Sequence, residues 1–144
     1  MTKIMQVVSL DEHAALPTKG YHDDAGFDLY VSEETTIMPH SFVDIPLGIA
    51  IKLPEGTWGL LTGRSSTLRK LGLLVAQGVI DCGYTGPLFA GVWNMNDFPV
   101  TVKQGDRVAQ YLIMNNASLD VVAHMVESLP ETQRGQSGFG STGV

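Results

Sequence analysis

The sequence predicts an all-β fold, and three observations support that prediction. Sixteen glycines and seven prolines divide the 144 residues into short apolar stretches. The stretches are rich in Val, Ile, Leu and aromatic residues, and turn formers such as PEG at 54–56 and KQGD at 103–106 bound them. Helical periodicity does not extend over more than a few residues. We therefore expect a sandwich or barrel of short strands with one or two helical turns.

The strands are expected at the apolar stretches, and one short helix is expected among them. In STLRKLGLL at 66–74, Leu68, Leu71 and Leu74 are spaced to lie on one face of a helix. The expected strands are FVDIPLGIAI at 42–51, TWGLLTG at 57–63, GPLFAGVWN at 86–94, FPVTVKQG at 98–105 and RVAQYLIM at 107–114.

Composition excludes several classes of protein. The length and the 44% hydrophobic content suit one globular domain. A net charge of −6 argues against binding to long nucleic acid, and no apolar run is long enough to cross a membrane. We expect a cytoplasmic or otherwise soluble intracellular protein. The single cysteine, Cys82, cannot form an internal disulfide, and no zinc-ligand spacing is present.

The last fifteen residues differ from the rest of the chain. PETQRGQSGFGSTGV at 130–144 holds four glycines and one aromatic residue, so we expect a flexible C-terminal arm after a domain at 1–129. A simple mobile terminus is the plainer explanation. However, Arg134 and Phe139 supply the cation and the ring needed to close over a phosphorylated base.

The segment GRSSTLRK at 63–70 has the composition of a phosphate-binding loop. Arg64 offers a bidentate cation, and Ser65 and Ser66 offer hydroxyls at an expected helix start. The alternative is that one serine simply caps the helix.

In GVIDCGYTG at 78–86, Asp81 follows an apolar run and precedes a glycine-containing turn. A carboxylate there can activate water, or it can cap the turn.

Two further segments carry polar groups of the same kind. In DDAGFDLY at 23–30, Asp24 and Asp28 could hold a hydrated Mg²⁺ or orient a basic neighbour, while an Asx turn explains Asp24 equally well. In GDRVAQYLI at 105–113, the Gln110 amide is available to a ligand, whereas Asp106 and Arg107 read as a turn and an ion pair.

Taken in order, these four segments and RGQSGFGSTG at 134–143 resemble the five motifs of the trimeric dUTP diphosphatase (dUTPase) family. The resemblance implies a jelly-roll-like β-barrel of the β-clip type and a homotrimer with sites at subunit interfaces. In that family the C-terminal arm of one subunit closes a site formed by the other two. The implied reaction is hydrolysis of dUTP to dUMP and diphosphate, which limits uracil incorporation into DNA and supplies dUMP for dTMP synthesis.

The resemblance also implies a role for each matching residue. Asp81 matches the general base that activates water for attack at the α-phosphorus, and Tyr84 matches the aromatic that excludes a 2′-hydroxyl. Asp28 matches a supporting carboxylate, and Mg²⁺ is expected as cofactor through substrate phosphates and water, with no direct protein ligand. The residues that match substrate-binding positions are Arg64, Ser65, Ser66, Val75, Gly78, Val79, Ile80, Tyr84, Gln110, Arg134, Phe139, Gly140, Ser141 and Thr142.

Two positions depart from the usual family pattern. Ser137 stands where glycine is more usual, and Val75 stands where many bacterial relatives carry asparagine. Uracil recognition is therefore expected from backbone groups of a hairpin at 75–79.

Two rival functions differ in testable ways. The dCTP deaminase family shares similar segments but needs a glutamate where this chain has Gly91. A regulatory protein could keep the fold and use the nucleotide only as a switch.

Overall fold

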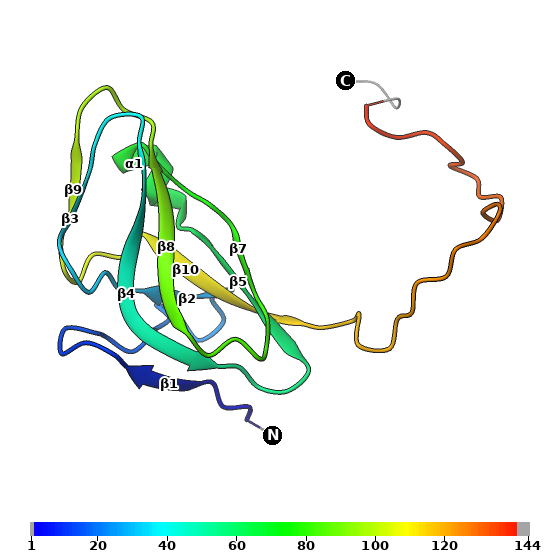
Figure 1. The fold of residues 1–144 in the computed structure, drawn as a ribbon, viewed down its shortest axis with the longest axis horizontal. Helices are drawn as coiled ribbons and strands as arrows, with labels where there is room; N and C mark the ends of the chain where they lie inside the picture. Colours follow the sequence, from blue (N-terminus) through cyan, green and yellow to red (C-terminus); the bar gives the residue numbers. More distant parts are fainter. Residues whose placement is uncertain (1, 141–144) are drawn as a thin grey trace.

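A computed structural model of the chain describes residues 2–140, and it confirms the all-β prediction (Figure 1). The elements in chain order are β1 (Gln6–Ser9), β2 (Gly26–Leu29), β3 (Thr35–Ile37), β4 (Phe42–Lys52), β5 (Thr57–Gly63), α1 (Ser65–Leu71), β6 (Leu73–Val75), β7 (Gly78–Ile80), β8 (Pro87–Asn94), β9 (Val100–Val102) and β10 (Ala109–Asn115).

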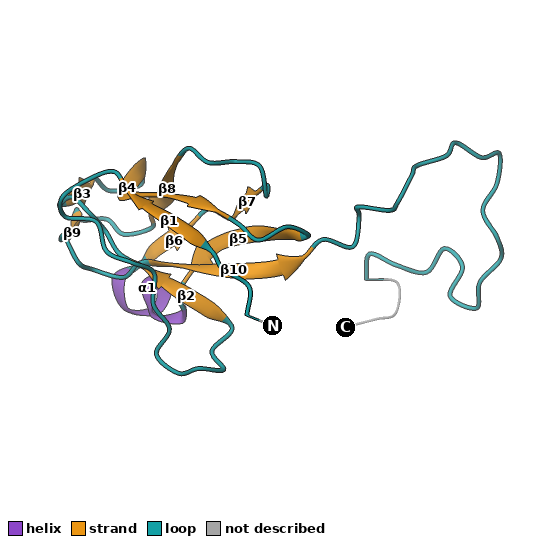
Figure 2. Ribbon diagram, turned by 90° about the horizontal axis from the view of Figure 1, so that it is seen from below, coloured by secondary structure: helices purple, strands orange, loops and turns teal. Residues whose placement is uncertain are grey.

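The described strands form two four-stranded sheets and one two-stranded ribbon. One sheet has the order β1-β4-β8-β6, the other has the order β2-β10-β5-β7, and β3 pairs with β9. Every pairing is antiparallel. The two sheets lie over each other (Figure 2), and one core cluster takes apolar side chains from both, including Ile45 and Val92 from the first and Leu61 and Tyr111 from the second. This is the sandwich that the short apolar stretches predict.

Strand β8 shows how the sequence builds this core. Leu88, Ala90, Val92 and Asn94 are buried, while the residues between them face outward, as the two-residue period of a strand requires. Its partner β4 changes register between Pro46 and Ala50, where Gly48 has a φ of 69°. A Cβ at Gly48 would lie 2.8 Å from the Ser32 Cβ, so glycine permits both the backbone conformation and the close packing.

Helix α1 begins and ends differently from the sequence-based expectation. Arg64 occupies the N-cap position with extended backbone, and no side chain caps the helix, so the capping alternative for Ser65 and Ser66 is wrong. The helix ends because Gly72 adopts the left-handed conformation and donates its N–H to the Leu68 carbonyl. Leu74 therefore lies in β6, and the expected helical face of Leu68, Leu71 and Leu74 does not form.

Beyond β10 the chain leaves the two sheets. Residues 116–140 contain no helix or strand and run away from the β body in both ribbon views (Figures 1 and 2). Several apolar side chains on this segment face solvent, among them Val122, Met125 and Leu129. In the described part of the chain, no helix has the length and apolar character needed to cross a membrane.

Candidate functional site

An aspartate on β2 joins two arginines from separate parts of the chain. The Asp28 Oδ1 atom lies 2.8 Å from Arg64 Nε, and its Oδ2 atom lies 3.3 Å from Arg107 Nη1. The Asp28 side chain is only 16% exposed, so this contact is better shielded from solvent than an ordinary surface pair. Arg64 also donates from Nη1 to the Arg107 carbonyl at 3.1 Å, which fixes the plane of its guanidinium group.

The register of β10 brings Gln110 to the same place. Gln110 is opposite Asp28 on β2 and opposite Thr62 on β5. Its amide nitrogen donates to the Gly63 carbonyl at 2.9 Å, and a Cβ at Gly26 would lie 2.7 Å from its amide oxygen. The amide is therefore held in one orientation by its neighbours, and Gly26 must be small for this to happen.

These residues line a polar pocket together with the loop before β2. Its lining includes Tyr21, Asp24, Asp28, Arg64, Ser65, Arg107 and Gln110. Arg64 and Arg107 present guanidinium N–H donors to the pocket and share the Asp28 carboxylate, while Asp24 adds a second carboxylate to its lining. Ser65, an exposed residue where α1 begins, adds a hydroxyl donor. The pocket is therefore suited to a small anionic ligand.

Two acidic residues near this pocket have structural roles. Asp24 ends a turn that its own backbone N–H closes on the Tyr21 carbonyl at 3.1 Å, and its side chain accepts from the Tyr21 N–H at 2.9 Å. This side-chain contact reaches three residues back along the chain, so Asp24 has a turn role but does not form the expected Asx turn, in which the side chain accepts from an N–H two residues ahead. Asp106 accepts from the Lys103 N–H at 2.8 Å and closes the turn before β10. Arg107 contacts Asp28 instead of forming the expected ion pair with Asp106.

Asp81 and Tyr84 lie on the turn after β7. The turn is closed by the Asp81 backbone carbonyl, which accepts from the Tyr84 N–H at 3.0 Å. The exposed carboxylate is therefore not needed to close the turn, as a capping role would require. The Tyr84 hydroxyl donates to the Pro87 carbonyl at 2.8 Å, and a Cβ at Gly86 would lie 2.7 Å from that hydroxyl oxygen. Gly86 thus leaves the space in which the Tyr84 ring lies.

Within one chain, the turn that carries Asp81 is far from the polar pocket that contains Arg64 and Arg107, called the arginine pocket from here on. Ile80 pairs with Gly59 on β5, whereas Arg64 follows the opposite end of that strand. Asp81, the residue after Ile80, is therefore level with Trp58 on β5, and Arg64 comes six residues after Trp58. Six residues of β-strand correspond to a distance of about 20 Å. The structure brings together Asp28, Arg64, Ser65 and Gln110, and it places Asp81 and Tyr84 elsewhere.

The residues at 75–80 do not form the expected hairpin. β6 pairs with β8 in one sheet, and β7 pairs with β5 in the other, so the link between them crosses from sheet to sheet. The Ala76 N–H already donates to the Gly91 carbonyl at 2.8 Å, and Val75 is buried. Gly78, Val79 and Ile80 lie on an edge strand of the described sheet, where backbone groups on the outer side are open to a ligand.

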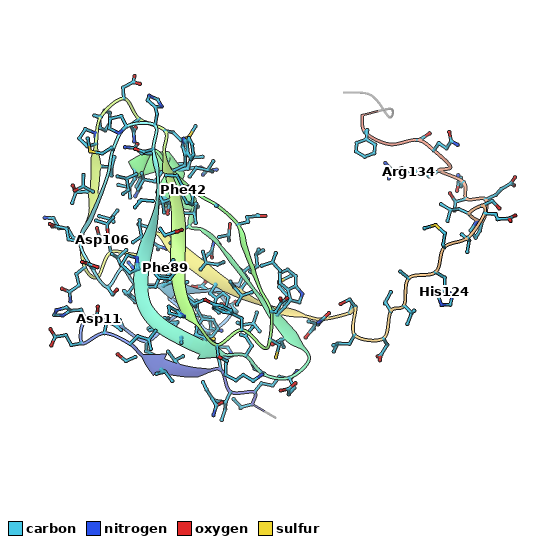
Figure 3. The ribbon with its side chains drawn as sticks, viewed as in Figure 1. Asp11, Phe42, Phe89, Asp106, His124 and Arg134 are labelled. Carbon is cyan, nitrogen blue, oxygen red and sulfur yellow. The ribbon has the colours of Figure 1, made fainter. Side chains whose placement is uncertain are left out.

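The C-terminal candidates lie on the extended tail, and Figure 3 shows Arg134 well away from the β body. Arg134 donates from Nε to the Ser137 carbonyl at 2.6 Å. Phe139 is fully exposed with a φ of 49°, and Gly140 has a φ of 88°. Ser141 and Thr142 lie outside the described residues.

Sequence reasoning undervalued two residues of these sites. The sequence predicts a turn and an ion pair with Asp106 for Arg107, but the antiparallel pairing of β10 with β2 brings Arg107 beside Asp28. Gly86 had no assigned role, although its proximity to Tyr84 could have suggested a close approach. Among residues 2–140, no three His, Cys, Asp or Glu side chains gather as a metal site.

The fold and the arginine pocket define the protein as an all-β protein with a site for a small anion. Comparison with known proteins then identifies its family. The family profile described as dUTPase matches residues 12–143. The chain belongs to the dUTPase family.

Named relatives and solved structures agree with this assignment. Deoxyuridine 5'-triphosphate nucleotidohydrolase from Yarrowia lipolytica is 39% identical over 97% of this chain and 89% of its own length. The enzyme of the same name from Corynebacterium jeikeium is 40% identical over 97% and 93%. The dUTPase of Staphylococcus bacteriophage 80alpha with dUPNHPP has a TM-score of 0.92 and 29% identity, and the match covers 99% of this chain and 100% of that one.

A mutant dUTPase from phage phi11 of S. aureus, which coordinates a structural Mg(II) ion, is also similar. Its TM-score is 0.75 with 25% identity, and the match covers 89% of this chain and 97% of that one.

Proposed function

We propose that the protein hydrolyses dUTP to dUMP and diphosphate. Relatives named for this substrate match nearly the whole chain. The observation that carries the proposal is the pocket of Asp28, Arg64, Arg107 and Gln110, because three of the five family motifs converge on it. In a cell the reaction would remove dUTP from the precursors of DNA and yield dUMP for dTMP synthesis.

The working enzyme is proposed to be a homotrimer with sites at subunit interfaces. Within a single chain, Asp81 lies about 20 Å from the arginine pocket along β5. A complete site therefore needs residues from more than one copy of the chain. The outer face of the β1-β4-β8-β6 sheet supports this view. Phe42, Phe89, Trp93 and Leu74 lie there with 42–48% of their surface exposed, and Figure 3 shows Phe42 and Phe89 on that face. Contact with another copy would bury this apolar face.

In this assembly Asp81 would act as the general base. Its carboxylate would take a proton from water as the water attacks the α-phosphorus, in line with the departing diphosphate. Tyr84, held by Pro87, would pack under the deoxyribose and leave no space for a 2′-hydroxyl. The outer edge of Gly78, Val79 and Ile80 would contact uracil, with buried Val75 shaping the adjoining wall.

The other subunit would hold the triphosphate. Arg64, Ser65, Ser66 and Gln110 supply donors, and Asp28 is proposed to orient the arginines instead of acting as a base. A triphosphate carries more negative charge than two arginines that share a carboxylate can neutralise. Mg²⁺ bound by the phosphates and by water would supply the remaining charge neutralisation. That assignment fits Asp28, whose oxygens both already contact arginine.

The arm at 130–144 is proposed to close a site on other subunits, with 1–129 as the folded domain. Arg134 would contact phosphate, Phe139 would stack on uracil, and Ser141 and Thr142 would contact the terminal phosphate, with Gly140 as a further substrate-binding residue. Apolar side chains at Val121, Val122 and Val126 face solvent in the single chain, which supports packing of the preceding segment against a second copy.

A product assay tests the proposed function. The protein is incubated with dUTP, dCTP, dTTP and UTP, each with and without Mg²⁺, and the nucleotides and diphosphate are separated by ion-exchange chromatography. We expect diphosphate and dUMP from dUTP alone at high rate, with Mg²⁺ raising that rate. Rapid conversion of dCTP to dUTP or dUMP would contradict the proposal. Deamination is not expected, because Gly91 carries no acid and a Cβ there would lie 2.7 Å from the Phe42 ring.

A further inference from the structure

A buried threonine in the first turn of α1 has no role in the proposed reaction. Among the described residues Ser65–Leu71 of α1, Thr67 alone is buried, with 2% of its surface exposed. The side of a helix that packs on a core is ordinarily apolar. The chain therefore places a hydroxyl group where an aliphatic side chain would be expected, and the contact that this hydroxyl makes explains why.

The Thr67 hydroxyl joins α1 to the beginning of β10. It donates to the Val108 carbonyl at 2.7 Å, and the contact is buried. Val108 is 1% exposed and comes directly before β10. Figure 2 shows α1 beside the first residues of that strand. The two residues are 41 positions apart in the chain, so only the fold brings them together.

Two further hydrogen bonds join the same two segments, but they are less shielded. The Arg64 guanidinium donates to the Arg107 carbonyl at 3.1 Å in an exposed contact. The Gln110 amide donates to the Gly63 carbonyl at 2.9 Å in a contact that is partly buried. A hydrogen bond in a low-dielectric interior is stronger than one that competes with water. The buried contact of Thr67 is therefore the firmest of the three.

We propose that Thr67 is a positioning residue for phosphate binding, because its hydrogen bond to Val108 fixes α1 relative to β10. Arg64 lies one helical turn before Thr67, and its carbonyl accepts from the Thr67 N–H at 3.0 Å. Arg107 directly precedes Val108, and Gln110 follows two residues later. A shift of α1 along β10 would thus move Arg64 away from the other two donors. Thr67 is buried, so it acts on the ligand only through these residues.

The identity of the ligand as the triphosphate of dUTP rests on the proposed function. The positioning role itself concerns only how the donors are held. It can therefore be measured with inorganic tripolyphosphate, which has no base or sugar and whose binding requires no hydrolysis.

A second buried threonine provides a matched control. Thr57 is 3% exposed, and its hydroxyl donates to the Pro54 carbonyl at 2.7 Å. Thr57 begins β5, whereas Arg64 follows the end of that strand. Removal of either hydroxyl takes a donor from a backbone carbonyl and should lower stability. Only removal at Thr67 loosens the contact between α1 and β10, so a difference in ligand binding between the two variants reports positioning.

The test compares Thr67→Val, Thr67→Ala and Thr67→Ser with Thr57→Val in the full-length protein. Steady-state kinetics give kcat and KM for dUTP, calorimetry gives the Kd of tripolyphosphate, and urea unfolding gives stability. We expect Thr67→Val and Thr67→Ala to raise KM and Kd about tenfold, as loss of one charge-assisted hydrogen bond to phosphate would, with little change in kcat. Thr67→Ser restores the hydroxyl donor and should keep both constants within about twofold of wild type. Thr57→Val should lose stability and keep both constants.

Unchanged KM and Kd in Thr67→Ala would overturn the proposal, because the hydroxyl would then not be needed. An equal rise in Thr67→Ser would overturn it as well, since loss of the methyl group would explain the effect. An equal rise in Thr57→Val would attribute the change to stability and would also overturn it. The alanine and serine variants differ by one hydroxyl oxygen, so their comparison stands even if Thr67→Val folds poorly. If wild type bound tripolyphosphate without hydrolysing dUTP, the proposed function would fail, and the rise in Kd would still support the positioning role.

Discussion

The Asp28 carboxylate lies 2.8 Å from the Arg64 guanidinium and holds it at the N-terminus of helix α1. The pair joins the end of β5 to β2, two strands that are not neighbours in their sheet, with β10 between them. Arg64 therefore points into the pocket through a contact that depends on the correct register of three strands. Its planar group also reaches the Arg107 carbonyl, a second contact that sets its orientation.

Replacing Arg64 by lysine should weaken substrate binding. Lysine keeps the charge but cannot contact Asp28 and the Arg107 carbonyl from two nitrogens of one plane. We expect KM for dUTP to rise about tenfold, the equivalent of one charge-assisted hydrogen bond of ~1.5 kcal/mol. Steady-state kinetics measure this change. Arg69→Lys, at an exposed position on the same helix, is the matched control, and an equal rise in KM there would contradict the role of Arg64.

Asp81→Asn should separate binding from chemistry. The amide preserves the shape of the side chain but cannot accept a proton from water. We expect kcat for dUTP to fall by about 10²–10⁴, the usual contribution of a general base. Affinity for a non-hydrolysable dUTP analogue, measured by calorimetry, should be unchanged. Asp97→Asn, at an exposed site, is the control, and near-normal turnover of the Asp81 variant would refute the base assignment.

Gly86→Ala should alter the choice between deoxyribose and ribose. The new methyl would lie 2.7 Å from the Tyr84 hydroxyl and would push the ring from its contact with Pro87. We expect the ratio of kcat/KM for dUTP over UTP to drop about tenfold, the effect of losing roughly 1.4 kcal/mol of steric discrimination. Gly83→Ala, where no atom lies within 4 Å of the new Cβ, provides the control. An unchanged ratio would separate Gly86 from sugar recognition.

Deletion of residues 134–144 should spare the fold and the assembly but not the activity. The two sheets and their core lie before this segment, so circular dichroism and thermal unfolding should match the full-length protein. Without a closing arm, water enters the site, and we expect turnover to fall about 100-fold. Sedimentation velocity measures the assembly. A truncated protein found as a monomer would contradict the proposed role of the arm.

Tyr111→Phe should change how stability depends on alkaline pH. Burial raises the folded-state pKa of Tyr111 to about 12 from 10.0, so the unfolded chain loses this proton first as pH rises. Stability should therefore fall between pH 10 and pH 12, by up to about 3 kcal/mol from this residue. The variant does not undergo this alkaline loss, and at pH 7 it should be at least as stable as wild type, because the hydroxyl that it removes is buried without a hydrogen-bond partner among the described residues. Urea unfolding at pH 8 and pH 11 measures the effect, and parallel pH dependences in the two proteins would disprove it.

Much of the fold follows from local sequence pattern. The expected strand at 57–63 coincides with β5, and the expected strand at 42–51 differs from β4 by one residue, because alternating and apolar runs between turn formers leave few other arrangements. The expectation was less accurate where tertiary contacts decide. β6 and β7 have three residues each, too few to carry a pattern, and Gly72 ends the helix before Leu74.

The sequence by itself determined the all-β class and the five motifs in order, because strand periodicity, turn residues and motif spacing depend only on residues that are close together in the chain. Only the tertiary structure decided which of those motifs meet. Pairing of β10 with β2 and β5 brings Asp28, Gln110 and Arg64 together, and the length of β5 keeps Asp81 at the other end. Such distances depend on strand register and sheet order, which arise from packing between residues that are remote in sequence.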